Sequence, residues 1–72
     1  MKHVPSVTKE HLEQVIDETI ILQTHAQRNR NLMKRRLIDG LTYEELAEEF
    51  DLSVKQVGNI ITASEDIIFK RL

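Results

Sequence analysis

The sequence predicts an all-α fold of four helices in a single domain. Apolar residues recur at the three- and four-residue spacing of helices, whereas no run alternates for long enough to indicate a strand. One Pro and two Gly leave long uninterrupted segments, and 72 residues suffice for one domain. A hydrophobic content of 40 % with 31 % charged residues is typical of a folded domain rather than a disordered chain.

The first helix is expected over residues 9–23, because the apolar positions from Leu12 to Ile20 follow helical spacing. We expect residues 1–7 to be a flexible N-terminal tail and residues 8–72 to form the domain.

The second helix is expected to begin after Thr24, which can form a Thr-x-x-Gln capping box with Gln27. It should end at Asp39, with Gly40 as the left-handed stop. The polar stretch "THAQRNRN" leaves an alternative open, in which the first two helices are one kinked rod. The buried stripe of the second helix is expected to consist of Ala26, Met33 and Leu37.

The third and fourth helices have the clearest starts. Thr42 is followed three residues later by Glu45, and Ser53 is followed three residues later by Gln56. Each of these two pairs can form a capping box at the start of its helix. The fourth helix is expected over residues 54–70. Helical spacing puts on its buried stripe Val54, Val57, Ile61, Ser64 and Ile68.

Between these two helices the residues "DLS" form a tight turn. The third helix buries Leu46 and Phe50, against which valines of the fourth helix can pack. A short helix, a tight turn and a second helix predict a helix-turn-helix over residues 42–71. Such turns usually open with Gly, and Asp51 stands there instead; Asp tolerates the left-handed conformation better than most residues.

The outer face of the fourth helix carries small and hydrogen-bonding side chains, centred on Lys55, Asn59 and Thr62. Asn and Gln can pair bidentately with adenine, and Lys can reach guanine or phosphate. Polar residues also cover the solvent face of any amphipathic helix, so this pattern alone does not distinguish DNA contact from solvation.

The run "GLTYEELAEEFDLSVKQVGNIITASEDIIFKRL" resembles region 4, the promoter-binding domain of bacterial sigma factors. It is still more similar to small stand-alone sigma-like proteins of phages and mobile elements in Gram-positive bacteria. The resemblance covers residues 32–72 and implies a recognition helix that enters the major groove at a promoter. The contacting positions that it implies are Val54, Lys55, Gly58 and Asn59. The family usually has Arg or Lys at several of these, and this chain has only Lys55.

The expected DNA-binding residues fall into two groups. Base contacts are expected from Ser53, Lys55, Gln56, Asn59 and Thr62. Half of the ten basic residues lie in "RNRNLMKRR", which serves either as a solubilising face or as a phosphate contact. Phosphate contacts are expected from Arg28, Lys34, Arg35, Arg36 and Thr42.

The net charge of −2 argues against a general nucleic-acid coat but allows a specific DNA-binding protein with segregated charge. We therefore expect a cytoplasmic, sequence-specific transcriptional regulator whose partner is double-stranded DNA. The alternative is a protein-interaction module that binds RNA polymerase or another regulator without contacting DNA.

An enzyme is not expected. The chain has no Cys, no Gly-rich phosphate loop and no nucleophile beside an evident base. His3, His11 and His25 do not share metal-ligand spacing, so neither a metal nor another cofactor is predicted. No apolar run approaches the length of a membrane span.

The apolar arc of the fourth helix is wide for a small core, which predicts a homodimer. The residues expected at its interface are Ile60, Ile67, Ile68, Phe69 and Leu72. The alternative is that the first helix covers this arc.

Overall fold

The computed structural model describes residues 8–21 and 24–72, and these residues form helices and connecting turns with no strand. The four helices in this part of the chain are α1 (Lys9–Thr19), α2 (Ala26–Leu37), α3 (Tyr43–Phe50) and α4 (Val54–Arg71). The predicted all-α class with four helices is confirmed. The predicted N-terminal tail, residues 1–7, lies outside the described residues.

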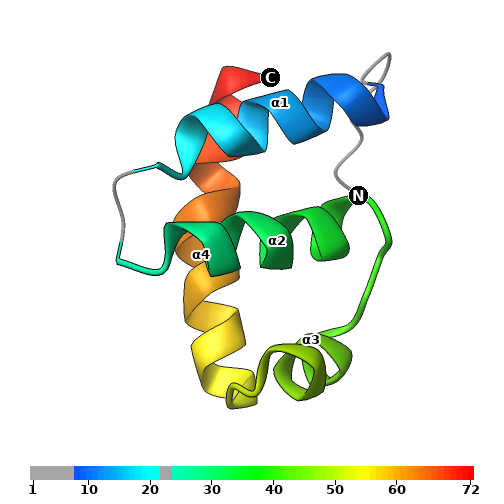
Figure 1. Ribbon diagram of the computed structural model, residues 1–72, viewed down its shortest axis with the longest axis vertical. Helices are drawn as coiled ribbons and strands as arrows, with labels where there is room; N and C mark the ends of the chain where they lie inside the picture. Colours follow the sequence, from blue (N-terminus) through cyan, green and yellow to red (C-terminus); the bar gives the residue numbers. More distant parts are fainter. Residues whose placement is uncertain (1–7, 22–23) are drawn as a thin grey trace.

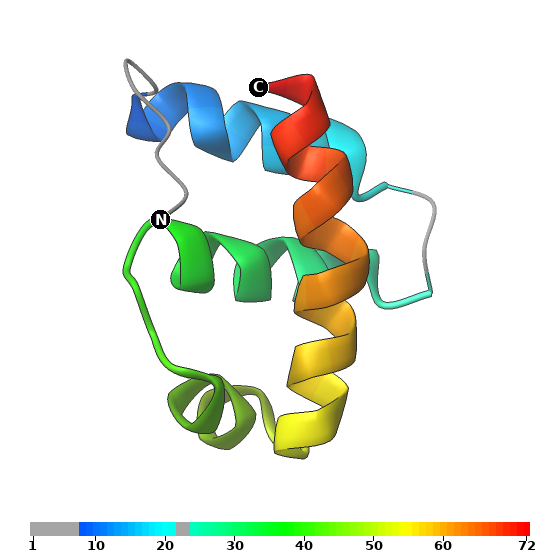
Figure 2. The same ribbon diagram turned by 180° about the vertical axis from the view of Figure 1, so that it is seen from behind.

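The helices are arranged around α4, which contacts each of the other three. Figures 1 and 2 show α1 and α2 lying side by side and antiparallel, with α4 crossing both. The short α3 lies at the N-terminal end of α4, away from α1. The first turns of α4 therefore extend beyond the α1–α2 pair, next to α3 alone.

The core takes side chains from all four helices. Its fully or nearly fully buried apolar residues are Val15, Ile16, Ile20, Leu32, Met33, Leu46, Ala47, Val57, Ile61 and Ile68. Partly buried apolar side chains from α3, the turn and the end of α4 surround this cluster. Because each helix presents one apolar stripe, burial of these stripes against one another is the main force that holds the helices together.

The junction between α1 and α2 differs from the prediction. α1 ends at Thr19 instead of residue 23, because Ile20 leaves helical geometry and its side chain is fully buried in the core. The Arg30 guanidinium donates to the Ile20 carbonyl at 2.7 Å and so satisfies a backbone acceptor at the helix end. Residues 22–23 lie outside the described residues. The kinked-rod alternative is wrong, since α1 and α2 are separate antiparallel helices.

The start and end of α2 also need correction. Its N-cap is His25, with no side-chain cap bond, so the capping box predicted for Thr24 and Gln27 is wrong. The helix ends at Leu37, two residues before the predicted end, while Gly40 does adopt the expected left-handed conformation (φ 73°). Its buried face is centred on Asn29, Leu32 and Met33, and the predicted Ala26 and Leu37 are only partly buried.

The predictions for the start of α3, the turn and the start of α4 are confirmed. Thr42 and Glu45 form a complete capping box, with Glu45 N–H donating to Thr42 Oγ1 at 3.1 Å and Thr42 N–H to Glu45 Oε1 at 2.8 Å. Ser53 and Gln56 form the same arrangement at the start of α4. Asp51 is left-handed (φ 56°), as the turn requires.

The buried stripe of α4 is confirmed for Val57, Ile61, Ser64 and Ile68, but not for Val54. The Val54 side chain is 43 % exposed. Helical periodicity extends the stripe to the first turn, whereas Val57 is the first residue of α4 that is buried in the core. Val54 is thus on the correct side of the helix but beyond the end of the core.

Candidate nucleic-acid interface

The residues expected to contact bases lie together on the first turns of α4. Ser53, Lys55, Gln56, Asn59 and Thr62 are all exposed; we call this set the recognition surface. Lys55, Asn59 and Thr62 lie opposite the buried Val57 stripe, Gln56 lies beside them, and Ser53 is the N-cap of α4.

Members of the recognition surface differ in what they have to offer a ligand. Lys55, Asn59 and Thr62 have no hydrogen-bond or ion-pair partner among the described residues. By contrast, Ser53 Oγ accepts from the Gln56 N–H at 3.1 Å, and Gln56 Oε1 accepts from the Ser53 N–H at 2.9 Å. Gln56 therefore keeps chiefly its amide N–H groups for an outside acceptor, while Asn59 keeps both an acceptor and a donor.

Tyr43, the first residue of α3, packs against the second turn of α4 at Gly58. A Cβ placed on Gly58 would lie 3.5 Å from Tyr43 Cε2, so the ring packs beside this glycine in ordinary contact distance. The guanidinium of Arg36 lies over the same ring, 5.1 Å from its centroid, and donates to the Leu41 carbonyl at 2.8 Å. Arg36, an expected phosphate contact, is thus part of the packing between α2 and α3.

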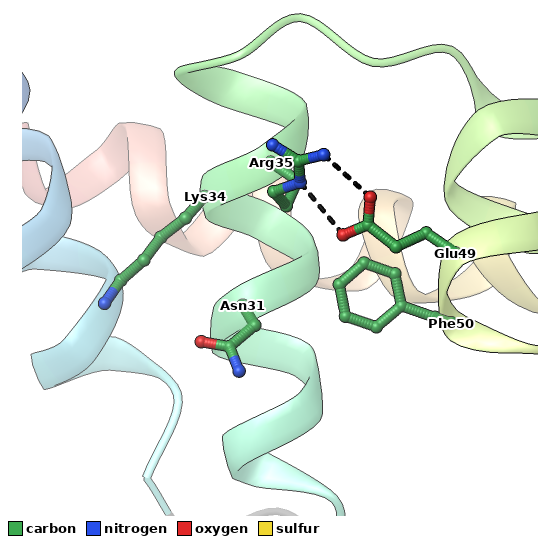
Figure 3. A pocket seen from close by; sticks show the side chains of 5 residues that line it. All are labelled: Asn31, Lys34, Arg35, Glu49 and Phe50. Carbon is green, nitrogen blue, oxygen red and sulfur yellow. Dashed lines mark hydrogen bonds and ion pairs between the residues drawn. The ribbon is translucent and has the colours of Figure 1, made fainter.

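Arg35, a second expected phosphate contact, joins α2 to α3. Its guanidinium donates to both carboxylate oxygens of Glu49, at 2.9 and 2.7 Å (Figure 3). It also donates to Asp39 at 2.8 Å. The hydrogen bonds that Glu49 accepts from Arg35 lower the pKa of Glu49, and the same bonds raise the pKa of Arg35 further above its ordinary value. The fork-shaped pairing leaves Arg35 few donors for a phosphate.

The remaining basic candidates on α2 also have partners. Lys34 Nζ lies 2.9 Å from Asp17 of α1, which Arg30 also approaches, at 3.8 Å. Arg28 Nε donates to Asn29 Oδ1 at 3.2 Å. The Thr42 hydroxyl accepts the Glu45 N–H of its cap. Each of the five expected phosphate contacts is therefore engaged in an interaction within the fold.

Most of these pairings could not be found from sequence spacing. Asp17 and Glu49 lie on different helices from their basic partners, so only the fold brings them together. Among the ion pairs of these cations, the Arg35–Asp39 pair, at i and i+4, has a local signal.

An open groove of about 440 Å³ lies between α2 and α3, which the sequence did not indicate. Figure 3 shows its lining: Asn31, Lys34 and Arg35 from α2, with Glu49 and Phe50 from α3. The Arg35–Glu49 pair crosses one end of the groove. Because its charged groups already pair with one another or with Asp17, the groove is a seam between helices more than a binding site.

Charge on the α3–turn–α4 unit is mainly negative. α3 carries four exposed glutamates, Glu44, Glu45, Glu48 and Glu49. The cations within this unit are Lys55, Lys70 and Arg71, and Lys70 pairs with Asp66 at 3.1 Å. Lys55 is consequently the basic side chain on the first two turns of α4.

The expected dimer surface is largely part of the molecule's own core. Ile68 is fully buried, so its assignment to a dimer interface is wrong. Phe69, Leu72 and Ile60 are partly buried against the core. α1 packs against α4, as the alternative supposed. Ile67, at 46 % exposed, is the member of the set that faces solvent.

Within residues 8–21 and 24–72, no cluster of three His, Cys, Asp or Glu side chains has the arrangement of a metal site. No helix in the same part of the chain has the length and apolar character needed to cross a membrane.

Comparison with known proteins adds no relative: no protein-family model, curated protein or solved structure matches this chain.

Proposed function

We propose that this protein is a sequence-specific DNA-binding transcriptional regulator, in which residues 42–71 act as a helix-turn-helix of the sigma region 4 type. The observation that carries the proposal is the recognition surface. The side chains of Lys55, Asn59 and Thr62 are exposed and without partners among the described residues, on the N-terminal half of α4. Side chains at the start of a recognition helix are those that contact base edges in proteins of this kind.

The shapes of the elements support this proposal. α3 has 8 residues and α4 has 18, which makes α4 roughly 27 Å long at 1.5 Å per residue. A helix about 10–12 Å wide fits the B-DNA major groove. The left-handed Asp51 turns the chain between α3 and α4, and Leu46, Ala47 and Val57 are buried together in the core where the two helices meet. This packing matters because base contacts require a helix held in one orientation.

The electrostatics support a binding mode that depends on base contacts more than on phosphates. Lys55 is the cation on the recognition surface, while Arg35, Arg36 and Lys34 are engaged within the fold. Affinity should therefore be modest, and its dependence on salt shallower than that of proteins with many phosphate contacts.

The proposal is tested by selecting preferred duplexes from a randomised DNA library and titrating them at several salt concentrations. Asn59→Ala should weaken binding to the selected duplex by about 1–3 kcal/mol, since a bidentate amide–adenine contact is worth that much. Lys55→Ala should weaken binding as well, and reduce the salt slope by about 1 if the lysine contacts phosphate.

Lys70→Ala is the matched control, because Lys70 lies on the same helix but pairs with Asp66 near the other end. Equal binding by wild type, Lys55→Ala and Asn59→Ala would contradict the recognition surface.

The internal pairing of the α2 cations, together with the acidic α3, favours one second candidate. In this alternative the protein binds RNA polymerase or another regulator and does not contact DNA. Retention of polymerase from a nuclease-treated bacterial lysate, with no duplex selected from the library, would support the alternative over DNA binding.

A further inference from the structure

Val54 is an apolar side chain that the fold leaves uncovered at the projecting end of α4. It is the first residue of the helix and is 43 % exposed, between Ser53 and Lys55 of the recognition surface. The core ends one turn further along, at Val57. A single exposed valine elsewhere on the surface would need no explanation. This one occupies the turn that would enter a DNA groove first.

Gly58 leaves Val54 without a covering side chain from the next turn of α4. It lies one helical turn after Val54 on the same flank of α4, where any larger side chain could fold back over the valine. The fold itself does not require glycine there. A Cβ on residue 58 would have only the Tyr43 ring within 4 Å, at 3.5 Å or more. Val54, with glycine one turn further along the helix, therefore presents apolar surface to whatever the start of α4 approaches.

The major groove offers a matching apolar group, the C5-methyl of thymine, which is the one methyl group that the four bases display there. We propose that Val54 contacts a thymine methyl and thereby selects an A·T base pair in the DNA site. This inference rests on the proposed function. It adds a specificity-determining contact that depends on apolar burial, beside the hydrogen bonds offered by Asn59 and Gln56.

The contact also fits the scarcity of basic side chains on this surface. Apolar contact with the methyl and bidentate pairing of Asn59 with adenine both favour A·T pairs and neither requires a cation. The resulting site contains at least one A·T pair near the start of α4, and its recognition depends weakly on salt.

The test replaces thymine by deoxyuridine, which removes only the methyl group. After a preferred duplex has been selected with the wild-type protein, each thymine in it is replaced in turn, and binding is measured by fluorescence anisotropy. For the wild type, one replacement should weaken binding about fourfold, the value expected for one buried methyl group. For Val54→Ala, the same replacement should change binding by less than about 1.5-fold, because the methyl then has little to contact.

Ile67→Ala is the matched control. Ile67 is exposed to a similar extent, at 46 %, but lies roughly 20 Å further along α4. It should retain the full fourfold effect of the deoxyuridine replacement. Each ratio compares two duplexes on one protein, so a change in folded fraction caused by the substitution cancels.

The outcomes separate this inference from the proposed function. If the wild type selects no duplex, DNA binding fails and the methyl contact fails with it. If a duplex is selected but contains no thymine whose methyl matters, the contact to Val54 is overturned while DNA binding stands. The contact to Val54 is also overturned if each deoxyuridine replacement weakens binding by Val54→Ala as much as it weakens binding by the wild type.

Discussion

At the residue scale, two left-handed positions end consecutive helices. Gly40 (φ 73°) follows α2, and Asp51 (φ 56°) follows α3. Glycine adopts this conformation without steric cost, whereas every other L-residue is strained by its Cβ, Asp and Asn least of all. The same backbone requirement is thus met by an ideal residue at one position and by a tolerable one at the other.

Asp51→Gly should therefore raise the free energy of unfolding by roughly 0.5–1 kcal/mol, since it removes the strain of a left-handed Cβ. The measurement is urea denaturation followed by circular dichroism. The matched change, Gly40→Ala, should lower the free energy of unfolding by about 1 kcal/mol or more, although no atom lies within 4 Å of the added Cβ. A loss of stability in Asp51→Gly would contradict strain at this turn.

Gly58 differs from these two positions because its backbone is helical. Glycine lowers stability there because the unfolded chain has more conformational entropy to lose at a glycine than at other residues. Gly58→Ala should stabilise the protein by about 0.5–1 kcal/mol, since the new methyl would meet Tyr43 at an ordinary contact distance. A higher melting temperature than that of the wild type is the expected readout. A lower one would mean that the Tyr43 ring cannot accept the methyl.

At the element scale, α3 and α4 begin with reciprocal caps and α2 does not. Ser53→Ala removes the acceptor for the Gln56 N–H and should cost about 1 kcal/mol of stability. Thr24→Ala is the control: Thr24 is exposed before α2 and is not its N-cap, so its loss should change stability by less than about 0.5 kcal/mol. Equal effects in a thermal unfolding experiment would show that Thr24 also caps a helix.

The Arg35–Glu49 pair links α2 to α3 and makes stability depend on pH. Because the folded-state pKa of Glu49 lies below its ordinary value, the pair contributes stability above the ordinary pKa of about 4.5. This contribution is lost as the pH falls through the lower, folded-state pKa. Glu49→Gln should therefore be less stable than the wild type at about pH 7, and the difference should disappear under strongly acidic conditions.

Denaturant unfolding at a series of pH values measures this difference. The control is Glu48→Gln, which removes a neighbouring exposed carboxylate with no ion-pair partner among the described residues. The same pH course in both variants would mean that the effect belongs to overall charge and not to Arg35.

At the scale of the whole molecule, the adjacent residues Ile67 and Ile68 lie on opposite sides of the boundary between surface and core. Ile68 is fully buried, so Ile68→Val should lower the free energy of unfolding by about 1 kcal/mol. Ile67→Val, on the exposed side, should leave it unchanged to within about 0.5 kcal/mol. Chemical denaturation of both variants measures the contrast, which would vanish if this end of α4 were loosely packed.

The same division bears on assembly. With Ile68 buried and Phe69 and Leu72 packed against the core, Ile67 is a small remnant of the expected dimer surface. A stable interface needs roughly 1,000 Å² or more of buried area, far beyond one half-exposed side chain. We therefore expect a monomer in sedimentation and a single, non-palindromic DNA site in the selection experiment. A wild-type dimer that Ile67→Glu converts to a monomer would reverse this expectation.

Local signals predicted the elements that depend on local chemistry. Thr42 with Glu45, Ser53 with Gln56 and the left-handed Asp51 each involve residues close in sequence, and each lies where it was predicted. The Thr24 prediction failed although its residue pattern is equally good, because burial of Ile20 decided where the chain turns. The exposed recognition surface was predictable because helical periodicity separates it from Val57.

By itself, then, the sequence determined four helices, two of their caps and which side of α4 meets solvent, because periodicity and capping act over a few residues. Only the tertiary structure decided which charged side chains pair with one another and which apolar side chains at the ends of α4 are buried. Glu49 and Asp17 engage Arg35 and Lys34 from other helices, Ile68 is buried in the shared core, and Val54 is left outside that core. These outcomes depend on how helices pack against one another, which no spacing along one helix records.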